Sequence, residues 1–146
     1  MLYTKCMHPQ ILFALGKMGH GSRILISDGG YPHITHSNPA ADKVYLNLSP
    51  GILTVSQILE VLKETVPIEE ITLMTPPDGT MQPVFEEYKR ITPADVPFNY
   101  VTQFPFYELA KESNIGLVIA TGDVRNYANM ILKVGFIKHP EGLGKY

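Results

Sequence analysis

Residues 116–120 read Gly-Leu-Val-Ile-Ala, and Thr-Gly-Asp follows directly at 121–123. A run of five residues without a polar side chain is typical of a strand that is buried on both faces, as the strands of parallel sheets are. The polar turn that follows it ends the strand. We therefore expect a sheet that contains residues 116–120 and is covered by helices on both faces.

Helical and strand-like segments alternate along the rest of the chain. Thr54 and Gln57 have the spacing of a capping box, and the apolar stripe that follows stops at Pro67. We expect helices at 9–18, 54–66, 82–91 and 105–113, and strands at 23–27, 44–48, 71–74, 98–101 and 116–120. Residues 129–134 favour a closing strand, with a helix as the alternative. This order predicts an α/β fold, a single domain over 1–146 built as a three-layer sandwich with a mostly parallel central sheet.

The composition excludes several classes of protein. The chain has 146 residues, with 12 Lys plus Arg against 14 Asp plus Glu. A net charge of −2 gives no electrostatic reason to expect a nucleic-acid partner or an anionic membrane surface. The single cysteine, Cys6, indicates a reducing compartment, and we find neither a signal peptide nor an apolar run long enough to cross a bilayer. We expect a cytoplasmic protein.

The common nucleotide-binding and serine-nucleophile motifs are absent from the sequence. It has no G-x-x-x-x-G-K-[ST], no G-x-G-x-x-G and no G-x-S-x-G. His33 and His36 are the one close histidine pair, in a loop that lacks the H-E-x-x-H pattern of a zinc site. We expect solvated loop histidines there, with metal ligation as the alternative, and we expect no cofactor.

Two segments are richer in polar residues and glycine than their strands require. Gly19-His20-Gly21-Ser22 precedes the first strand and Asp28 follows it, while Asp123 follows the strand at 116–120. In open α/β sheets ligands gather beyond the carboxyl ends of the strands, where Asp28 and Asp123 are expected. Each aspartate could equally be a turn residue. His20 could be a proton-transfer group at neutral pH or a partner for the end of the first helix.

Three motifs resemble the ribose pyranase and fucose mutarotase (RbsD/FucU) family. The first is Gly19-His20-Gly21 with Asp28 and Pro32. The second is Phe104-Pro105-Phe106-Tyr107-Glu108, which is similar to the fucose branch. The third comprises Thr121-Gly122-Asp123, Tyr127-Ala128-Asn129 and the segment 131–135. They keep the family's order and spacing from about residue 9 to residue 137, which makes the combination specific.

The resemblance implies an RbsD-like fold and an enzyme that interconverts the cyclic forms of a free monosaccharide without metal or cofactor. His20 would be the general acid/base, with Tyr127 as an assisting phenol, and Asp28 would bind a sugar hydroxyl. The remaining sugar contacts would come from Gln103, Tyr107, Tyr127, the Ala128 backbone and Asn129. Position 103 is Arg in the fucose branch and His in the ribose branch, so Gln103 is a departure. Tyr107 could equally be a half-buried helix residue.

His20 and Asp28 lie on either side of one predicted strand. Eight extended residues at about 3.3 Å each could place them some 25 Å apart. If both contact one sugar, the site is shared between subunits, and the chain is an obligate homo-oligomer. This agrees with the ring-like assemblies that the resemblance implies, a decamer among them.

The sequence therefore leads to one hypothesis and three alternatives. The hypothesis is a mutarotase for a free monosaccharide, with L-fucose favoured over D-ribose. The alternatives are a D-ribose pyranase, a sugar-binding module without catalysis, and a metal-dependent sugar isomerase or hydrolase that uses His33 and His36.

Overall fold

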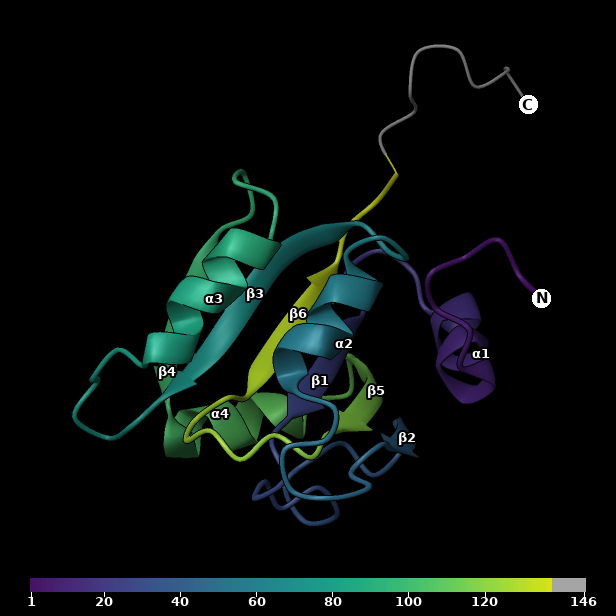
Figure 1. The fold of residues 1–146 in the computed structure, drawn as a ribbon. Coiled ribbons are helices and arrows are strands. Elements are labelled where there is room, and N and C mark those ends of the chain that lie inside the picture. Colours follow the sequence, from purple (N-terminus) through teal and green to yellow (C-terminus); the bar gives the residue numbers. More distant parts are fainter. Residues whose placement is uncertain (138–146) are drawn as a thin grey trace.

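A six-stranded sheet forms the centre of the molecule (Figure 1), and the computed structural model describes residues 1–137. The strand order is β2-β5-β1-β6-β3-β4. The strands are β1 (Arg23–Ser27), β2 (Asp42–Tyr45), β3 (Ile68–Thr75), β4 (Phe98–Thr102), β5 (Ile115–Ala120) and β6 (Met130–Val134). The predicted domain over 1–146 extends into residues 138–146, which lie outside the described part of the chain.

The sheet is mostly parallel, as predicted. β5 pairs in parallel with β1 and β2, and β3 pairs in parallel with β4. β6 lies between β1 and β3 and runs antiparallel to both. The closing segment is therefore a strand, and the helix alternative is wrong. Ile131 faces one side of the sheet while Met130 and Leu132 face the other, which is the period of a strand buried on both faces.

Among the residues described there are four helices: α1 (Pro9–Lys17) precedes β1, and α2 (Val55–Leu62), α3 (Pro83–Ile91) and α4 (Gln103–Ala110) connect strands. The predicted capping box is confirmed, since Thr54 Oγ1 accepts from the Gln57 amide at 3.3 Å and Gln57 Oε1 accepts from the Thr54 amide at 2.8 Å. α2 ends four residues earlier than predicted. The helical conformation is disfavoured before Pro67, and the chain turns there instead.

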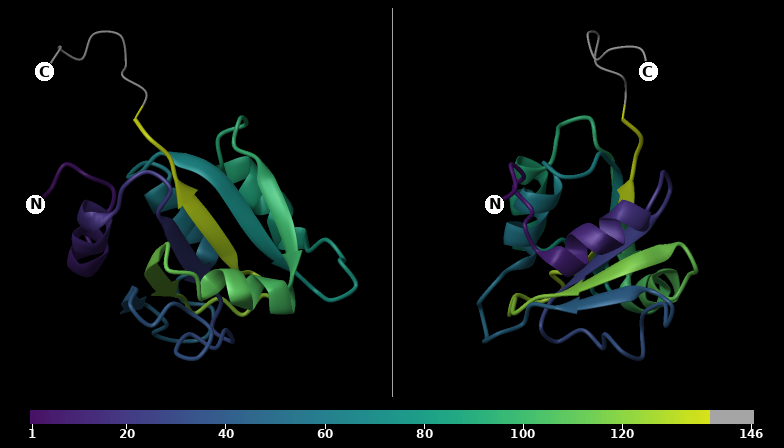
Figure 2. Two further views of the ribbon diagram at one scale, coloured as in Figure 1. Left: turned by 180° about the vertical axis from the view of Figure 1, so that it is seen from behind. Right: turned by 90° about the vertical axis from the view of Figure 1, so that its right-hand side faces the viewer.

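The helices cover both faces of the sheet. α1, α2 and α3 pack on the face that carries Ile24, Ile26, Leu117 and Ile119. α4 packs on the opposite face. Figure 2 shows α4 in front of the sheet when the molecule is seen from behind. The three-layer prediction is confirmed, and the expected central run at 116–120 is buried between the layers.

One edge of the sheet is the edge where ligands gather in open α/β folds. The carboxyl ends of β1, β2, β3, β4 and β5 meet there, and the loop before β6 returns to the same edge because β6 is antiparallel. β2 ends at Tyr45, shorter than the predicted 44–48, because the chain leaves the sheet there and Leu48 becomes exposed. Residues 46–50 are thereby free to line this edge.

Part of the core is polar at this edge. Ser27, Thr121 and Asn129 are buried with hydrogen-bond partners, as buried polar groups require. Within residues 1–137, no helix has both the length and the hydropathy that crossing a bilayer demands.

Candidate functional site

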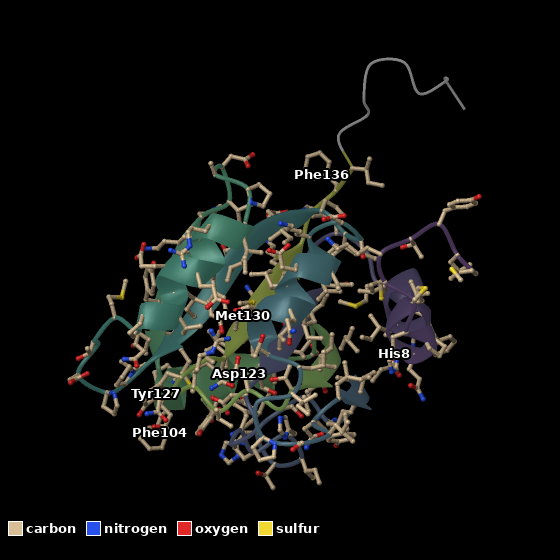
Figure 3. The ribbon with its side chains drawn as sticks, viewed as in Figure 1. His8, Phe104, Asp123, Tyr127, Met130 and Phe136 are labelled. Carbon is tan, nitrogen blue, oxygen red and sulfur yellow. The ribbon has the colours of Figure 1, made fainter. Side chains whose placement is uncertain are left out.

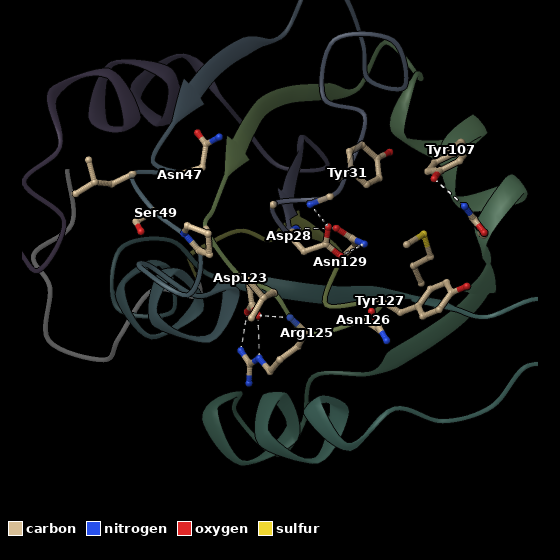
Figure 4. A pocket seen from close by; sticks show the side chains of 18 residues that line it. Asp28, Tyr31, Asn47, Ser49, Tyr107, Asp123, Arg125, Asn126, Tyr127 and Asn129 are labelled. Atoms are coloured by element: carbon tan, nitrogen blue, oxygen red, sulfur yellow. Dashed lines mark hydrogen bonds and ion pairs between the residues drawn. The ribbon is translucent and has the colours of Figure 1, made fainter.

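A pocket of about 670 Å³ opens at the carboxyl edge of the sheet (Figure 4). Its walls come from three loops, the end of β3 and the start of α4, which are far apart in the sequence. The side chains that line it and bear a polar group are Asp28, Tyr31, Asn47, Ser49, Gln103, Tyr107, Asp123, Arg125, Asn126, Tyr127 and Asn129. Carboxylate, amide and phenol groups of this kind suit a polyhydroxylated ligand.

Asp28 and Asn129 form a reciprocal pair on the floor of this pocket. Asn129 Nδ2 donates to Asp28 Oδ2 at 2.8 Å, and the Asp28 amide donates to Asn129 Oδ1 at 2.8 Å. The Gly30 amide donates to Asp28 Oδ1 at 2.9 Å. These bonds fix the carboxylate although Asp28 and Asn129 are 101 residues apart. The sequence placed both residues at the site, and the structure brings them together.

Burial raises the pKa of Asp28 above its ordinary value, against the lowering effect of its hydrogen bonds to Gly30 and Asn129. A carboxyl group whose pKa is higher in the folded state binds its proton more tightly there. It therefore reduces stability as the pH rises from the unfolded pKa, about 4, through the higher folded pKa. We expect the melting temperature of Asp28→Asn, minus that of the wild type, to increase with pH across this window in thermal unfolding from pH 4 to 7.5.

Asp78→Asn is the matched control for this pH dependence. Asp78 is exposed, and hydrogen bonds from Thr80 lower its pKa. Its ionised form stabilises the fold above the unfolded pKa, so the difference for Asp78→Asn should fall slightly near pH 4 and then stay flat up to pH 7.5. A lost hydrogen bond, about 1 kcal/mol, offsets the Asp28→Asn curve without changing its slope. A flat or falling Asp28→Asn difference would contradict the buried-carboxylate interpretation.

Aromatic side chains form a second wall. Gln103 Nε2 donates to Tyr107 Oη at 2.9 Å across the first turn of α4. The ring of Tyr31 contacts that of Tyr107 with centroids 5.5 Å apart, and its hydroxyl donates to the His36 carbonyl at 2.7 Å. Gln103 and Tyr107, which the sequence predicted at the site, thus both line the pocket and are hydrogen-bonded to each other. Tyr107 is half-buried and lines the pocket as well, so its two interpretations are compatible.

Tyr127 reaches the pocket from a strained backbone position. Its φ is +56°, in the left-handed region that residues other than glycine rarely adopt. Ala128, in contrast, does not line the pocket. Its side chain is fully buried and its carbonyl accepts the Tyr88 hydroxyl at 3.1 Å. The Ala128 carbonyl is thus already a hydrogen-bond acceptor inside the core.

Asp123 lies at the carboxyl end of β5, as expected, and is tied to Arg125. Arg125 Nε donates to Asp123 Oδ1 at 2.9 Å and Nη2 donates to Oδ2 at 2.7 Å. Burial opposes ionisation of Asp123, but the hydrogen bonds from Arg125 and Val55 outweigh it and lower its pKa. Asp123 therefore lines the pocket and also organises the turn that follows β5.

His20 lies away from this pocket, at the other end of β1. Its Nε2 is 2.6 Å from Glu69 Oε2, and its ring centroid is 5.4 Å from that of Phe136. Figure 3 shows Phe136 at the end of the molecule opposite to Tyr127 and Phe104. Hydrogen bonds from Lys133 and His20 lower the pKa of Glu69. Within one chain, His20 and Asp28 therefore lie far apart, which agrees with the expectation from the length of the strand between them.

His33 and His36 pack against tyrosines. The ring centroid of His36 is 4.5 Å from that of Tyr107, and the centroid of His33 is 5.7 Å from that of Tyr31. Burial lowers the pKa of His33. In the part of the chain that the structure covers, no three His, Cys, Asp or Glu side chains gather as a metal site requires.

The comparison with protein families identifies this chain. The model of the RbsD / FucU transport protein family matches residues 1–137. The chain belongs to the RbsD/FucU family. This confirms the resemblance seen in the three sequence motifs.

Relatives in the RbsD/FucU family carry two different names. The chain is 30% identical over 143 residues to a fucose mutarotase of Bos taurus, covering 90% of each protein. It is also 30% identical over 132 residues to a D-ribose pyranase of Exiguobacterium sibiricum, covering 90% of this chain and 95% of that one. Among solved structures, Bacillus subtilis RbsD complexed with D-ribose superposes with a TM-score of 0.82 at 24% identity, over 94% of this chain and 100% of that one. This last similarity confirms the RbsD-like fold.

Several pocket residues were not predicted. Tyr31, Asn47, Ser49, Met74 and Arg125 all line it. Ser49 could have been found, because it follows the predicted strand at 44–48 on the edge where ligands gather, whereas Asn47 was predicted to lie within that strand. Tyr31 and Met74 had no comparable signal in the sequence, since an isolated aromatic or methionine residue is more often part of a core.

Proposed function

We propose that this RbsD/FucU protein is a mutarotase that interconverts the ring forms of a free monosaccharide. The observation that carries the proposal is the Asp28–Asn129 pair, a fixed and buried carboxylate-amide unit at the floor of a pocket lined with phenols and amides. Such groups suit the vicinal hydroxyls of a sugar. The names of the relatives, fucose mutarotase and D-ribose pyranase, support the same class of reaction.

The reaction requires proton transfer and no covalent intermediate. The anomeric hydroxyl loses its proton, the ring oxygen gains one, and the open aldehyde closes again on either face. We assign this transfer to His20, with Tyr127 assisting as a phenolic donor. The hydrogen bond to Glu69 occupies Nε2 of His20, so Nδ1 is the atom that we assign to exchange with the sugar.

The same proposal requires a second copy of the chain. The His20 side chain is 54% exposed and lies beside Phe136, at the end of the molecule opposite to Tyr127 and Phe104. A neighbouring subunit that places its His20 over the Asp28 pocket would complete the site. We therefore propose a homo-oligomer with shared sites, consistent with the closed symmetry of most oligomers. A cytoplasmic location is part of this proposal and suits a buried free cysteine, Cys6.

We propose L-fucose as the substrate in preference to D-ribose. The Phe104–Glu108 segment, which resembles the fucose branch, places Tyr107 at the pocket. Gln103 supplies a neutral amide where that branch has Arg, and its hydrogen bond to Tyr107 keeps it at the pocket wall. A D-ribose pyranase is the alternative, because position 103 also differs from the ribose branch.

Saturation transfer between anomeric proton signals tests the proposal. We expect the wild-type protein, in the presence of a chelator, to accelerate exchange of L-fucose more than that of D-ribose. Faster exchange of D-ribose would favour the pyranase. Sugar binding without accelerated exchange would indicate a binding module, and exchange that appears only with a divalent ion would indicate the metal-dependent alternative.

A further inference from the structure

The Arg125 side chain makes four hydrogen bonds at the pocket, all of them to protein groups. Its Nε and Nη2 hold Asp123 at 2.9 and 2.7 Å, as described above. Its Nη1 donates to Glu87 Oε2 at 2.7 Å, and Nη2 also donates to Ser56 Oγ at 3.1 Å. Four donor contacts of one guanidinium are thus made to protein groups, in a fork geometry that lysine cannot reproduce.

These bonds connect the loop before β6 to two helices. Ser56 lies in α2 and Glu87 in α3, both on the face of the sheet away from α4. Asp123 adds to the connection, because its Oδ2 accepts from the Val55 amide at 3.0 Å and its Oδ1 accepts from the Arg125 amide at 3.0 Å. Figure 4 shows Asp123 and Arg125 joined side by side at the pocket.

The segment between this cluster and β6 carries the strained residue of the site. Tyr127 lies two residues after Arg125 and two before Asn129, which is itself held by Asp28. The left-handed φ of +56° at Tyr127 is unfavourable for a residue with a Cβ atom and persists only where its surroundings hold it. The segment is therefore held at both ends, by Arg125 and by Asn129.

We propose that Arg125 is a positioning residue that fixes the backbone of Tyr127 for sugar binding, and that it is not itself a ligand of the sugar. This rests on the proposed function, in which Tyr127 contacts the sugar. The guanidinium directs its donors at Asp123, Glu87 and Ser56. Among the 18 described residues that line the pocket, Arg125 is the one with a cationic side chain. Because its charge is paired with protein carboxylates, the pocket has no cationic group available for an anionic sugar.

The test separates positioning from a role in stability alone. Arg125→Met leaves Asp123, which is 2% exposed, as a buried charge without its partner and should lower the melting temperature. Adding Asp123→Asn removes that charge and should restore much of the loss. We expect the double variant to remain folded yet to show kcat/KM lower by about 10- to 100-fold, through a higher KM and a lower kcat, because the displaced Tyr127 both contacts the sugar and assists the proton transfer.

Arg90→Met is the matched control, since Arg90 is an exposed arginine of α3. Arg90→Met should match the wild type in kcat, KM and melting temperature. Arg125→Lys is a milder second variant that retains the charge beside Asp123, and it should show the same combined loss in KM and kcat if the double variant fails to fold. A stable double variant, or Arg125→Lys, with wild-type kcat and KM would overturn the positioning role.

Amide hydrogen exchange gives a readout that does not depend on activity. We expect the amides of residues 126–128 to exchange at least about 10-fold faster in the double variant than in the wild type or Arg90→Met, because the loop loses its anchor. Unchanged exchange there would also overturn the inference. If the wild type neither binds nor interconverts any sugar, the proposed function fails, whereas faster exchange would still identify Arg125 as the anchor of the loop.

Discussion

His20→Ala should slow the exchange of sugar ring forms by about 10²- to 10⁴-fold, the usual contribution of a positioned acid/base group. The expected loss is mostly in kcat, because the pocket that binds the sugar lies at the other end of the chain and is left intact. Saturation transfer with L-fucose, over a range of sugar concentrations, measures both parameters. Retention of more than about a tenth of the wild-type rate would exclude His20 as the acid/base.

The loss should not come from unfolding. His20 is exposed, and Glu69 keeps its hydrogen bond from Lys133 at 2.7 Å when the imidazole is removed. We therefore expect the melting temperature to change by no more than a few degrees, about 1 kcal/mol or less. His8→Ala is the matched control, because His8 lies outside the pocket, before α1, and should keep the wild-type rate.

Mixing two inactive variants tests whether the site is shared. In a random 1:1 assembly of His20→Ala and Asp28→Ala chains, about a quarter of the shared sites would combine an intact His20 with an intact Asp28. Activity should then return to roughly that fraction of the wild-type rate. No recovery, after subunit exchange has been demonstrated by mass, would exclude a site built from two copies.

Gly122→Ala should destabilise the protein by about 2–4 kcal/mol and disrupt the pocket. A Cβ atom at Gly122 would clash with the backbone carbonyls of Ser49 and Ile52. Those residues cannot move freely, because the Gly122 amide donates to Leu53 O at 2.9 Å and its carbonyl accepts from the Gly51 amide at 2.6 Å. Displacing this loop removes one pocket wall, so we expect a melting temperature lower by about 5–15 °C and a large loss of sugar affinity.

Gly16→Ala is the matched control for a glycine substitution. Gly16 lies in α1, and a Cβ atom there would meet no atom within 4 Å. Alanine in a helix is favoured over glycine by about 0.5–1 kcal/mol, so this variant should be slightly more stable than the wild type. If Gly122→Ala melts within 2 °C of the wild type, as measured by thermal unfolding, the docking of residues 49–53 on Gly122 does not limit stability or pocket shape.

Local pattern was sufficient for most of the elements. The capping box at Thr54 and Gln57 and the apolar run at 116–120 depend on neighbours within a few residues, and both appear in the structure. Boundaries were less accurate. β2 ends at Tyr45, and residues 47–50 leave the sheet and line the pocket. No local sequence pattern indicates this end of the strand.

The separation of His20 and Asp28 was determined by the sequence alone. A strand has a fixed rise per residue, so residues before and after it lie at its opposite ends in any fold that contains it. The same reasoning placed Asp28 and Asp123 together, because parallel strands end at one edge.

Only the tertiary structure decided which groups pair at the two ends of the sheet. Asn129 meets Asp28 over 101 residues, Arg125 meets Ser56 over 69 and His20 meets Glu69 over 49. Each pair depends on strand order and on the antiparallel insertion of β6 between β1 and β3. Strand order follows from the packing of all the strands and helices around one core. Hydrogen bonds between residues far apart in the sequence therefore depend on the whole core, and no short segment of sequence specifies them.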